Sequence, residues 1–352
     1  MNTSKTTAPE IWRQLQAAGL VKPGQTPSWP PQTVPTPWYV RLMLGVCGWL
    51  GGMFLLAFIG ALLFDALRDD GWMIVGLLLI AAAFVIYRLT QHDLGEQFAL
   101  ALSMAGQGAI GIWLFTSHAT DTATALFGIA LMQVLLASLM PHFLHRLLST
   151  MFAILALHFG LNVSLKASPM LAVSAWLMAV LWLYESTSQL HLRTGFLPLA
   201  MGVTLALLVI VAPAFETHYF LRQNGDLRAL GWGQRDLINP LVLALIFLWT
   251  VARLTQGVPI PRRIAALAAA SLFALVGWWA AGLVVGMLLL LLGFTRGRRA
   301  LTGLGIAASL AYLSWFYYSL EWTLLIKAVS LMATGGLLLL AYFGMRRVWG
   351  TA

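Results

Sequence analysis

The chain has 352 residues, of which 60% are hydrophobic and only 9% are charged, with a mean hydropathy of +0.83 and a net charge of +9. A soluble domain carries roughly 25% charged residues, so a water-soluble fold would have to expose large apolar patches. The composition therefore excludes an ordinary soluble protein and indicates that lipid surrounds most of the chain. The single cysteine, Cys47, excludes internal disulfides, thiolate metal clusters and CxxC redox chemistry.

The first 37 residues are expected to form a cytoplasmic tail in front of a membrane domain that spans 38–352. Thr7 and Glu10 have capping-box spacing, and the following residues place apolar side chains on one face, which predicts a short amphipathic helix. This helix could lie on headgroups, on a partner or on the protein itself. The proline-rich stretch 23–37 predicts an extended linker. No secretory signal is recognised near Met1, so the first membrane helix is expected to be retained.

From Trp38 onward, apolar runs alternate with short polar breaks, which predicts an all-α, polytopic bundle of about twelve transmembrane helices. The run 264–294 would be about 46 Å long as one helix, which is too long without a steep tilt. Gly277 and the two tryptophans after it predict a turn at an interface within this run. The predicted spans are 41–64, 72–87, 98–115, 123–140, 147–163, 170–184, 196–215, 239–254, 263–278, 281–295, 300–318 and 322–343.

The basic residues predict the orientation of these spans. With twelve spans, most of the 21 Lys and Arg residues fall on the side that holds both termini. The positive-inside rule then places the N- and C-termini in the cytoplasm, whereas eleven spans would put the basic loop 296–299 outside. The positive charge is therefore explained by topology, and no nucleic-acid partner is expected.

A weak internal repeat is also possible. The tetrapeptide RLTQ occurs at 88–91 and at 253–256, at the ends of the second and eighth predicted spans. These are equivalent positions in two halves of six spans each. Parallel repeats of this kind occur in transporters, so a 6+6 duplication is one hypothesis and a chance match is the other.

Three stretches carry a resemblance to a known family: WRQLQAAGLV in the tail, WYVRLMLGVCGWLGGMFLLAFIGALLF at 38–64 and YYSLEWTLLIKAVSLMATGGLLLLA near the C-terminus. Together they resemble the bacterial domain-of-unknown-function family 4401, over nearly the whole chain. The resemblance implies a multi-pass protein of the inner membrane of Gram-negative bacteria. It also implies a partner, because relatives are often encoded beside a second membrane protein with a GDYxxLxY-type motif. The family implies no established activity, so it supplies no functional residues and no cofactor.

Lys327 is the most unusual residue of the last predicted span, because a charge within a membrane costs free energy unless it is paired or reaches water. Glu321 lies at the start of that span, six residues earlier, and therefore on a different face of the helix. One interpretation is that the Lys327 ammonium extends to the nearby interface. The other is that it points into the bundle, toward a carboxylate such as Asp65 or an anionic substrate.

Gln107 and Gln133 are both expected near the middle of the membrane, about ten residues into the third and fourth predicted spans. Because a short loop joins these spans, the two amides could hydrogen-bond to each other and hold the helices together. The alternative is that they line a polar translocation cavity. His158 and Asn162 share a face of the fifth span, which predicts either a satisfied polar pair or a proton relay.

Other patterns bear on the class of function. His142 and His145 are expected to form a pair at the cytoplasmic interface rather than a zinc site. GxxxG spacings at Gly48/Gly52 and Gly282/Gly286 predict close helix packing. Four prolines, at 169, 198, 213 and 240, are expected at helix ends, which argues against the broken helices of transporters.

The chain contains no GxSxG, HExxH or Walker motif, so no catalytic activity and no cofactor are predicted. The first hypothesis is a non-enzymatic inner-membrane component that packs with a membrane partner. The alternative is a small-solute or lipid transporter or flippase. An intramembrane enzyme ranks third.

Overall fold

The computed structural model describes residues 8–19, 21, 38–63, 70–90, 93–116, 121–165, 169–184, 190–212, 238–276 and 281–319, and six single positions between 325 and 339. The chain divides into two units, residues 1–48 and 49–352. In the first unit, helix α1 (Ala8–Ala17) confirms the predicted short helix of the tail. Gly19 follows it with a φ of 67°, a left-handed conformation that glycine adopts readily and that commonly ends helices. The proline-rich linker lies outside the described residues.

The rest of the described chain is helical, and helix α2 (Trp38–Leu63) continues from the first unit into the second. Each predicted span from 41–64 to 300–318 coincides with one helix, including the separate helices on either side of 277–280. The last predicted span, 322–343, is described only at isolated positions. The remaining helices are α3 (Gly71–Leu89), α4 (Asp93–Thr116), α5 (Thr122–Leu139), α6 (Phe143–Leu165), α7 (Met170–Tyr184), α8 (Leu190–Ile210), α10 (Ile238–Leu254), α11 (Ile260–Val276), α12 (Ala281–Thr295) and α13 (Arg299–Ser319).

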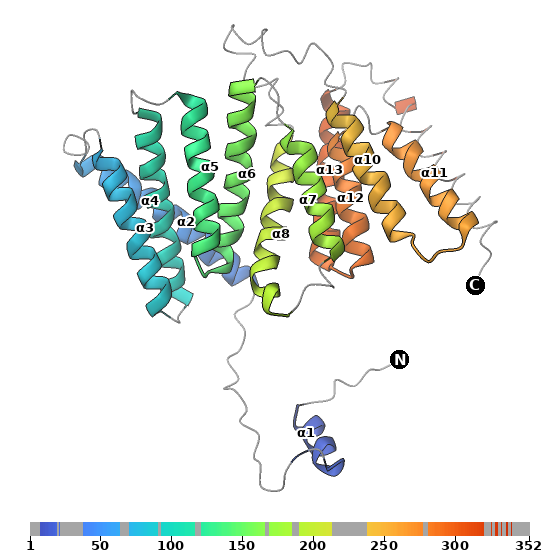
Figure 1. The fold of residues 1–352 in the computed structure, drawn as a ribbon, viewed down its shortest axis with the longest axis horizontal. Helices are drawn as coiled ribbons and strands as arrows, with labels where there is room; N and C mark the ends of the chain where they lie inside the picture. The colour runs from blue at the N-terminus through green and yellow to red at the C-terminus, as the bar shows by residue number, and fades with distance from the viewer. Residues whose placement is uncertain are drawn as a thin grey trace. The chain divides into compact units, whose positions relative to one another are not determined.

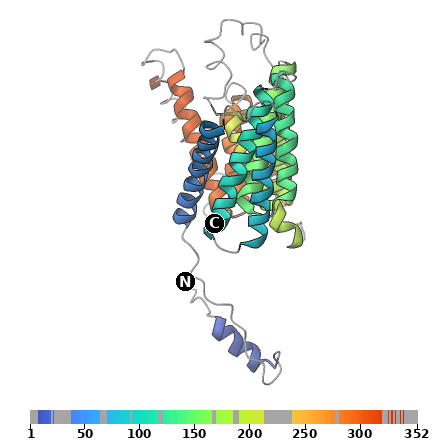
Figure 2. The same cartoon turned by 90° about the vertical axis from the view of Figure 1, so that its left-hand side faces the viewer.

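Four helices among the described residues are long and apolar enough to cross a membrane: Gly71–Leu89, Gly95–Thr116, Thr122–Leu139 and Phe143–Leu165. Several shorter helices, such as α7 and α12, are equally apolar. These lengths and compositions indicate a helical membrane protein. Figures 1 and 2 show α3, α4, α5 and α6 side by side as a group of roughly aligned helices.

Helices α3–α5 bury many alanines and present many large apolar residues outward. Ala83 of α3 and Ala109 of α4 are fully buried, whereas Leu78 of α3 is 65% exposed and Leu131 of α5 is 62% exposed. A soluble protein avoids such contiguous apolar exposure, but lipid tails are as apolar as leucine, so association of membrane helices depends on close backbone approach at small residues. The distribution of side chains thus agrees with the membrane nature of the chain.

Glycines bring several helix pairs into close contact. Gly76 of α3 faces Gly106 of α4, and a Cβ on either glycine would lie 2.7 Å from the carbonyl oxygen of the other. Gly282 and Gly286 of α12 face α13, where a Cβ on Gly286 would lie 3.0 Å from the backbone nitrogen of Ser309. The close packing predicted at Gly282 and Gly286 is therefore confirmed, and the helix that packs against them is α13 of the same chain. In the first pair, Gly52 faces the backbone of α4.

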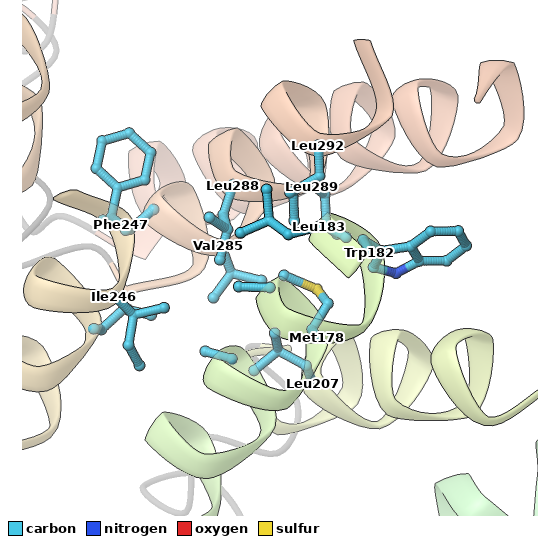
Figure 3. Packing of buried hydrophobic residues seen from close by; sticks show 14 of the residues in the cluster. Met178, Trp182, Leu183, Leu207, Ile246, Phe247, Val285, Leu288, Leu289 and Leu292 are labelled. Atoms are coloured by element: carbon cyan, nitrogen blue, oxygen red, sulfur yellow. The ribbon is translucent and has the colours of Figure 1, made fainter. Parts of the chain in front are cut away.

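The largest apolar core lies between α7, α8, α10, α11, α12 and α13. Figure 3 shows Met178 and Trp182 of α7 near Leu207 of α8 and the leucines of α12. Trp182 is fully buried, and its indole nitrogen donates a hydrogen bond to Thr204 Oγ1 at 3.0 Å. The hydroxyl of Thr204 in turn donates to the backbone oxygen of Ala200, four residues earlier in the same helix. This region is therefore held mainly by the packing of apolar side chains, although the buried hydroxyl of Ser174 on α7 has no hydrogen-bond partner.

One predicted helix end is wrong. Pro198 was expected at the start of a span, but it lies inside α8, which begins at Leu190. The residues LHLRTG before the proline, 190–195, extend the helix, although they are too polar to count toward an apolar span. Pro169 directly precedes α7 and Pro240 lies in the first turn of α10, as predicted, while residue 213 lies outside the described residues.

Candidate functional site

A buried polar network connects α4, α5 and α6. It consists of Ser103 and Gln107 on α4, Gln133 on α5, and His145 and Ser149 on α6. All five side chains are buried; Gln107 is 7% exposed and Gln133 4%. In each of the two helices that contribute a pair, the residues are four apart and therefore lie on the same face. The network is thus a direct product of helical spacing.

A continuous set of hydrogen bonds joins these side chains. Gln133 Nε2 donates to Gln107 Oε1 at 2.8 Å, and Gln107 Nε2 donates to Ser103 Oγ at 3.1 Å. Ser103 Oγ lies 2.7 Å from His145 Nε2, which is also 3.3 Å from Gln107 Nε2. On the other side of the ring, His145 Nδ1 lies 3.3 Å from Ser149 Oγ. The series of hydrogen bonds therefore links α5 to α4 and α4 to α6.

These donors and acceptors specify the proton position on His145. The Nε2 amide group of Gln107 can only donate, so His145 Nε2 must be the unprotonated acceptor. Ser103 then donates its hydroxyl proton to His145 Nε2 while it accepts from Gln107. A neutral imidazole carries its one proton on the other nitrogen, so Nδ1–H points to Ser149. Every hydrogen bond of the network thus has a defined direction, with the donor on the side of Gln133 and the acceptor on the side of Ser149.

A second group of polar and aromatic side chains borders His145. His142, just before α6, lies 3.2 Å from the carboxylate of Glu96, and its ring stacks on Tyr87 with a centroid distance of 5.1 Å. Tyr87 also meets the His145 ring edge to face at 6.0 Å. Burial lowers the pKa of His142 from its ordinary value of 6.5, although the Glu96 carboxylate acts in the opposite direction. His142 and Glu96 are both partly exposed, so this group extends from the network to the end of the helices.

Several buried atoms around the network have no hydrogen-bond partner in the structure. They are the Oε1 atom of Gln133, the phenolic oxygen of Tyr87, the Nδ1 atom of His142 and the Oε1 atom of Gln97. An unpaired buried polar atom costs about 1–3 kcal/mol. All four lie on or next to α3–α6, so a polar ligand, a water molecule or a proton that binds in this part of the fold could supply the missing partners.

The predicted contact between Gln107 and Gln133 is confirmed by the hydrogen bond between their amides. Gln107 lies 14 residues after the start of α4 and nine before its end, and Gln133 lies 11 residues after the start of α5 and six before its end. The contact is therefore at least about 9 Å from the ends of both helices by helical rise. Its depth in the membrane stays a prediction.

His142 and His145 lie at the same end of α6 and both contact Tyr87, so the two histidines are close together as predicted. His142 is partly exposed, whereas His145 is fully buried in the network. Ser103, Tyr87 and Ser149 were not singled out from the sequence. The i, i+4 spacing of a serine and a glutamine, and of a histidine and a serine, could have indicated them. The described residues contain no cluster of three or more His, Cys, Asp or Glu side chains that could hold a metal ion.

The remaining candidates do not join this network. Asn162 Nδ2 lies 3.1 Å from His158 Nε2, which confirms the predicted polar pair on α6. The His158 ring also meets Phe159 edge to face at 5.3 Å. Lys327, Glu321 and Asp65 lie outside the described residues.

The arrangement suits two roles. Hydrogen bonds between helices hold α4, α5 and α6 together, and each such bond contributes about 0.6–2 kcal/mol in a membrane. A hydrogen-bonded histidine that two serines and two amides surround could also accept and pass on a proton. No carboxylate or thiolate is positioned in the network to act as a nucleophile.

Comparison with known proteins identifies the family. The family described as Domain of unknown function (DUF4401) matches residues 37–348, nearly the whole chain. No curated protein and no solved structure matches the chain significantly. The resemblance expected from the two ends of the sequence is therefore confirmed, and the chain belongs to the DUF4401 family of domains of unknown function.

Proposed function

We propose that the protein is a non-enzymatic, multi-pass component of the bacterial inner membrane that packs against a second membrane protein. The observation that carries this proposal is a line of small residues on the outer face of α13. Gly303, Ala307 and Ala311 are four residues apart and all exposed, and a Cβ on Gly303 would meet nothing within 4 Å. Lines of this spacing permit close approach of another helix.

The opposite face of α13 shows how the protein uses such residues internally. Gly305 is buried against α12, where a Cβ would lie 2.6 Å from the backbone nitrogen of Leu290. In contrast, the exposed positions of α3 and α5 are mostly large, such as Leu78 and Leu131. An exposed line of small residues offers lipid little contact, and it is better suited to a protein helix than to acyl chains.

The positions of the basic residues support an orientation with both termini in the cytoplasm. Arg88 and Arg253 lie in the last turns of α3 and α10, and Arg296 directly follows α12. In Figure 1 the C-terminal ends of α3, α5, α10 and α12 all lie at the lower edge of the helices. By the positive-inside rule this edge is the cytoplasmic one. The resemblance to the family adds a candidate partner, a membrane protein with a GDYxxLxY-type motif.

Affinity purification in mild detergent tests the proposal. The unmodified protein, expressed in its own host, is expected to recover a membrane protein in a stoichiometric amount. Gly303→Leu combined with Ala307→Leu should abolish this recovery without lowering expression, because both positions face outward. Ala82→Leu, at an exposed position of α3, is the matched control and should retain the partner. Failure of the parent protein to recover any such partner would refute the proposal.

A transporter or flippase is the second candidate, and the unpaired atoms of the buried network favour it. Gln107 and Gln133 are too buried to line an open path in this conformation. Transport past them would therefore need a second conformation in which they are accessible to water. Gln133→Cys, in a Cys47→Ser background, would then react with a water-soluble thiol reagent in membranes. No reaction at position 133 would argue against a transport path through the network.

A further inference from the structure

We infer that His145 Nε2 is a proton-binding site, and that one proton bound there reverses the direction of every hydrogen bond from Ser103 to Gln133. The inference is independent of any membrane partner. It follows from the order of donors and acceptors in the network and from the unpaired oxygen at its far end.

The present state leaves one acceptor unused. Gln133 Nε2 donates to Gln107, while Gln133 Oε1 is buried without a partner. Gln107 directs its amide nitrogen toward Ser103 and His145, so both of its polar atoms are committed. A glutamine amide that turns by 180° exchanges its donor and acceptor with almost no change in shape. The two amides can therefore adopt a second arrangement in the same space.

Protonation of His145 requires that second arrangement. When a hydronium ion delivers a proton to Nε2 and leaves as water, the ring keeps its Nδ1–H and becomes an imidazolium. Nε2–H then donates to Ser103 Oγ, and the Ser103 hydroxyl must find another acceptor. Gln107 supplies it by turning its Oε1 toward Ser103 and the ring, and its Nε2 then donates to Gln133 Oε1 once that amide has also turned. The acceptor that was unpaired becomes paired, and the unpaired group is now Gln133 Nε2.

The surroundings of His145 offer a route for this proton. Glu96 on α4 and His142 before α6 are the titratable groups at the partly exposed end, 3.2 Å apart. Tyr87 on α3 contacts both histidine rings, and its buried hydroxyl has no partner. From α5 the network receives only the uncharged Gln133. Among the described residues in this group, Glu96 supplies the negative charge that would balance an imidazolium, and the route would run from this carboxylate past the rings of His142 and Tyr87.

Nuclear magnetic resonance of the full-length protein in lipid nanodiscs tests the inference, with nitrogen-15 in the histidine rings and glutamine side chains. At neutral pH we expect one ring, absent in His145→Gln, that is protonated at Nδ1 and not at Nε2. On acidification this ring should gain a proton at Nε2, and the side-chain amide signal of Gln133, identified with Gln133→Leu, should shift over the same pH range. A ring protonated at Nε2 at neutral pH would overturn the inference, as would a Gln133 signal that does not follow the titration.

Ser103→Ala removes the link between the ring and the amides and adds no bulk. In this variant His145 should still titrate, but the pH-dependent shift of Gln133 should be lost. Ser138→Ala is the matched control, because the Ser138 hydroxyl donates to the backbone oxygen of Val134 and lies outside the network. If His145→Gln does not fold, Ser149→Ala identifies the ring instead, through the changed shift of Nδ1. Coupling that persists in Ser103→Ala would overturn the inference.

Discussion

The helices α3–α6 and the helices α7–α13 solve the same packing problem in different ways. In the first region, three helices are connected by hydrogen bonds between Ser103, Gln107, Gln133 and His145. In the second, a large apolar core surrounds Trp182, whose indole donates to Thr204 of the neighbouring helix α8. Stability of the second region therefore depends on the volume and apolar character of its side chains, while stability of the first depends on matched hydrogen-bond donors and acceptors.

The difference matters because lipid removes much of the hydrophobic driving force between membrane helices. An apolar core is then stabilised mainly by close packing, and a cavity in it removes van der Waals contacts from the side chains around it. In a polar network, each donor must face an acceptor, because an unpaired donor or acceptor costs free energy. The first region can consequently respond to a proton or a ligand, whereas the second provides a fixed support.

The largest effect is expected from Trp182→Ala in the apolar region. The substitution leaves a large void at a fully buried position and removes the donor to Thr204. We expect a loss of about 3–5 kcal/mol in the free energy of unfolding, measured by denaturation with sodium dodecyl sulfate in mixed micelles. Trp176→Ala, on the same helix but 49% exposed, is the control and should have a small effect. Equal losses for the two variants would contradict the assignment of Trp182 to the core.

A smaller effect is expected in the polar region from Gln107→Leu, which preserves volume but deprives Gln133 Nε2 of its acceptor. The same measurement should show a loss of about 0.6–2 kcal/mol. Replacement of both glutamines by leucine should cost less than the sum of the two single substitutions, because no unpaired amide then remains. Strict additivity would show that the two amides do not interact.

The smallest effect concerns pH. Burial lowers the pKa of His142 below 6.5, so the folded state favours its neutral form. Its contribution to stability is therefore fully present above about pH 6.5 and is lost as the pH falls through the lower pKa of the folded state. Thermal denaturation between pH 7 and pH 5 should show this loss in the parent protein and less of it in His142→Gln. Glu96→Gln should steepen it, because the carboxylate favours the protonated form. A stability that rises as the pH falls would be inconsistent with this sign.

Much of the helical framework could be predicted from the sequence, because apolar runs longer than about 15 residues have few alternatives to a helix in lipid. The break near 277 and the contact of Gln107 with Gln133 followed from length limits and from the cost of an unpaired amide. Helix ends were less predictable, since polar residues such as those at 190–195 can extend a helix beyond its apolar part. The number of membrane-spanning helices and the 6+6 repeat stay predictions.

Only part of the polar network, the contact between Gln107 and Gln133, could be predicted from the sequence, and the reason is physical. A glutamine in an apolar run stands out, but Ser103 is small and common, and His145 lies near a polar break that suggested an interface. Which residues meet depends on the rotation of α4 against α6, and that rotation is set by packing over the full length of both helices. Sequence spacing specifies which residues share a face, but it does not specify which faces meet.

Pro198 has a consequence for the backbone hydrogen bonds of α8. Proline lacks a backbone N–H, so the carbonyl of residue 194 loses its usual donor and the first two turns of α8 are joined to the remainder by a weakened segment. Beyond the proline, Ala200 and Leu207 are fully buried, and α8 packs against α6 as well as against α7 and α12. In the helix that borders both regions of the molecule, the missing backbone hydrogen bond thus lies in the first turns, and the buried part that follows retains its own bonds.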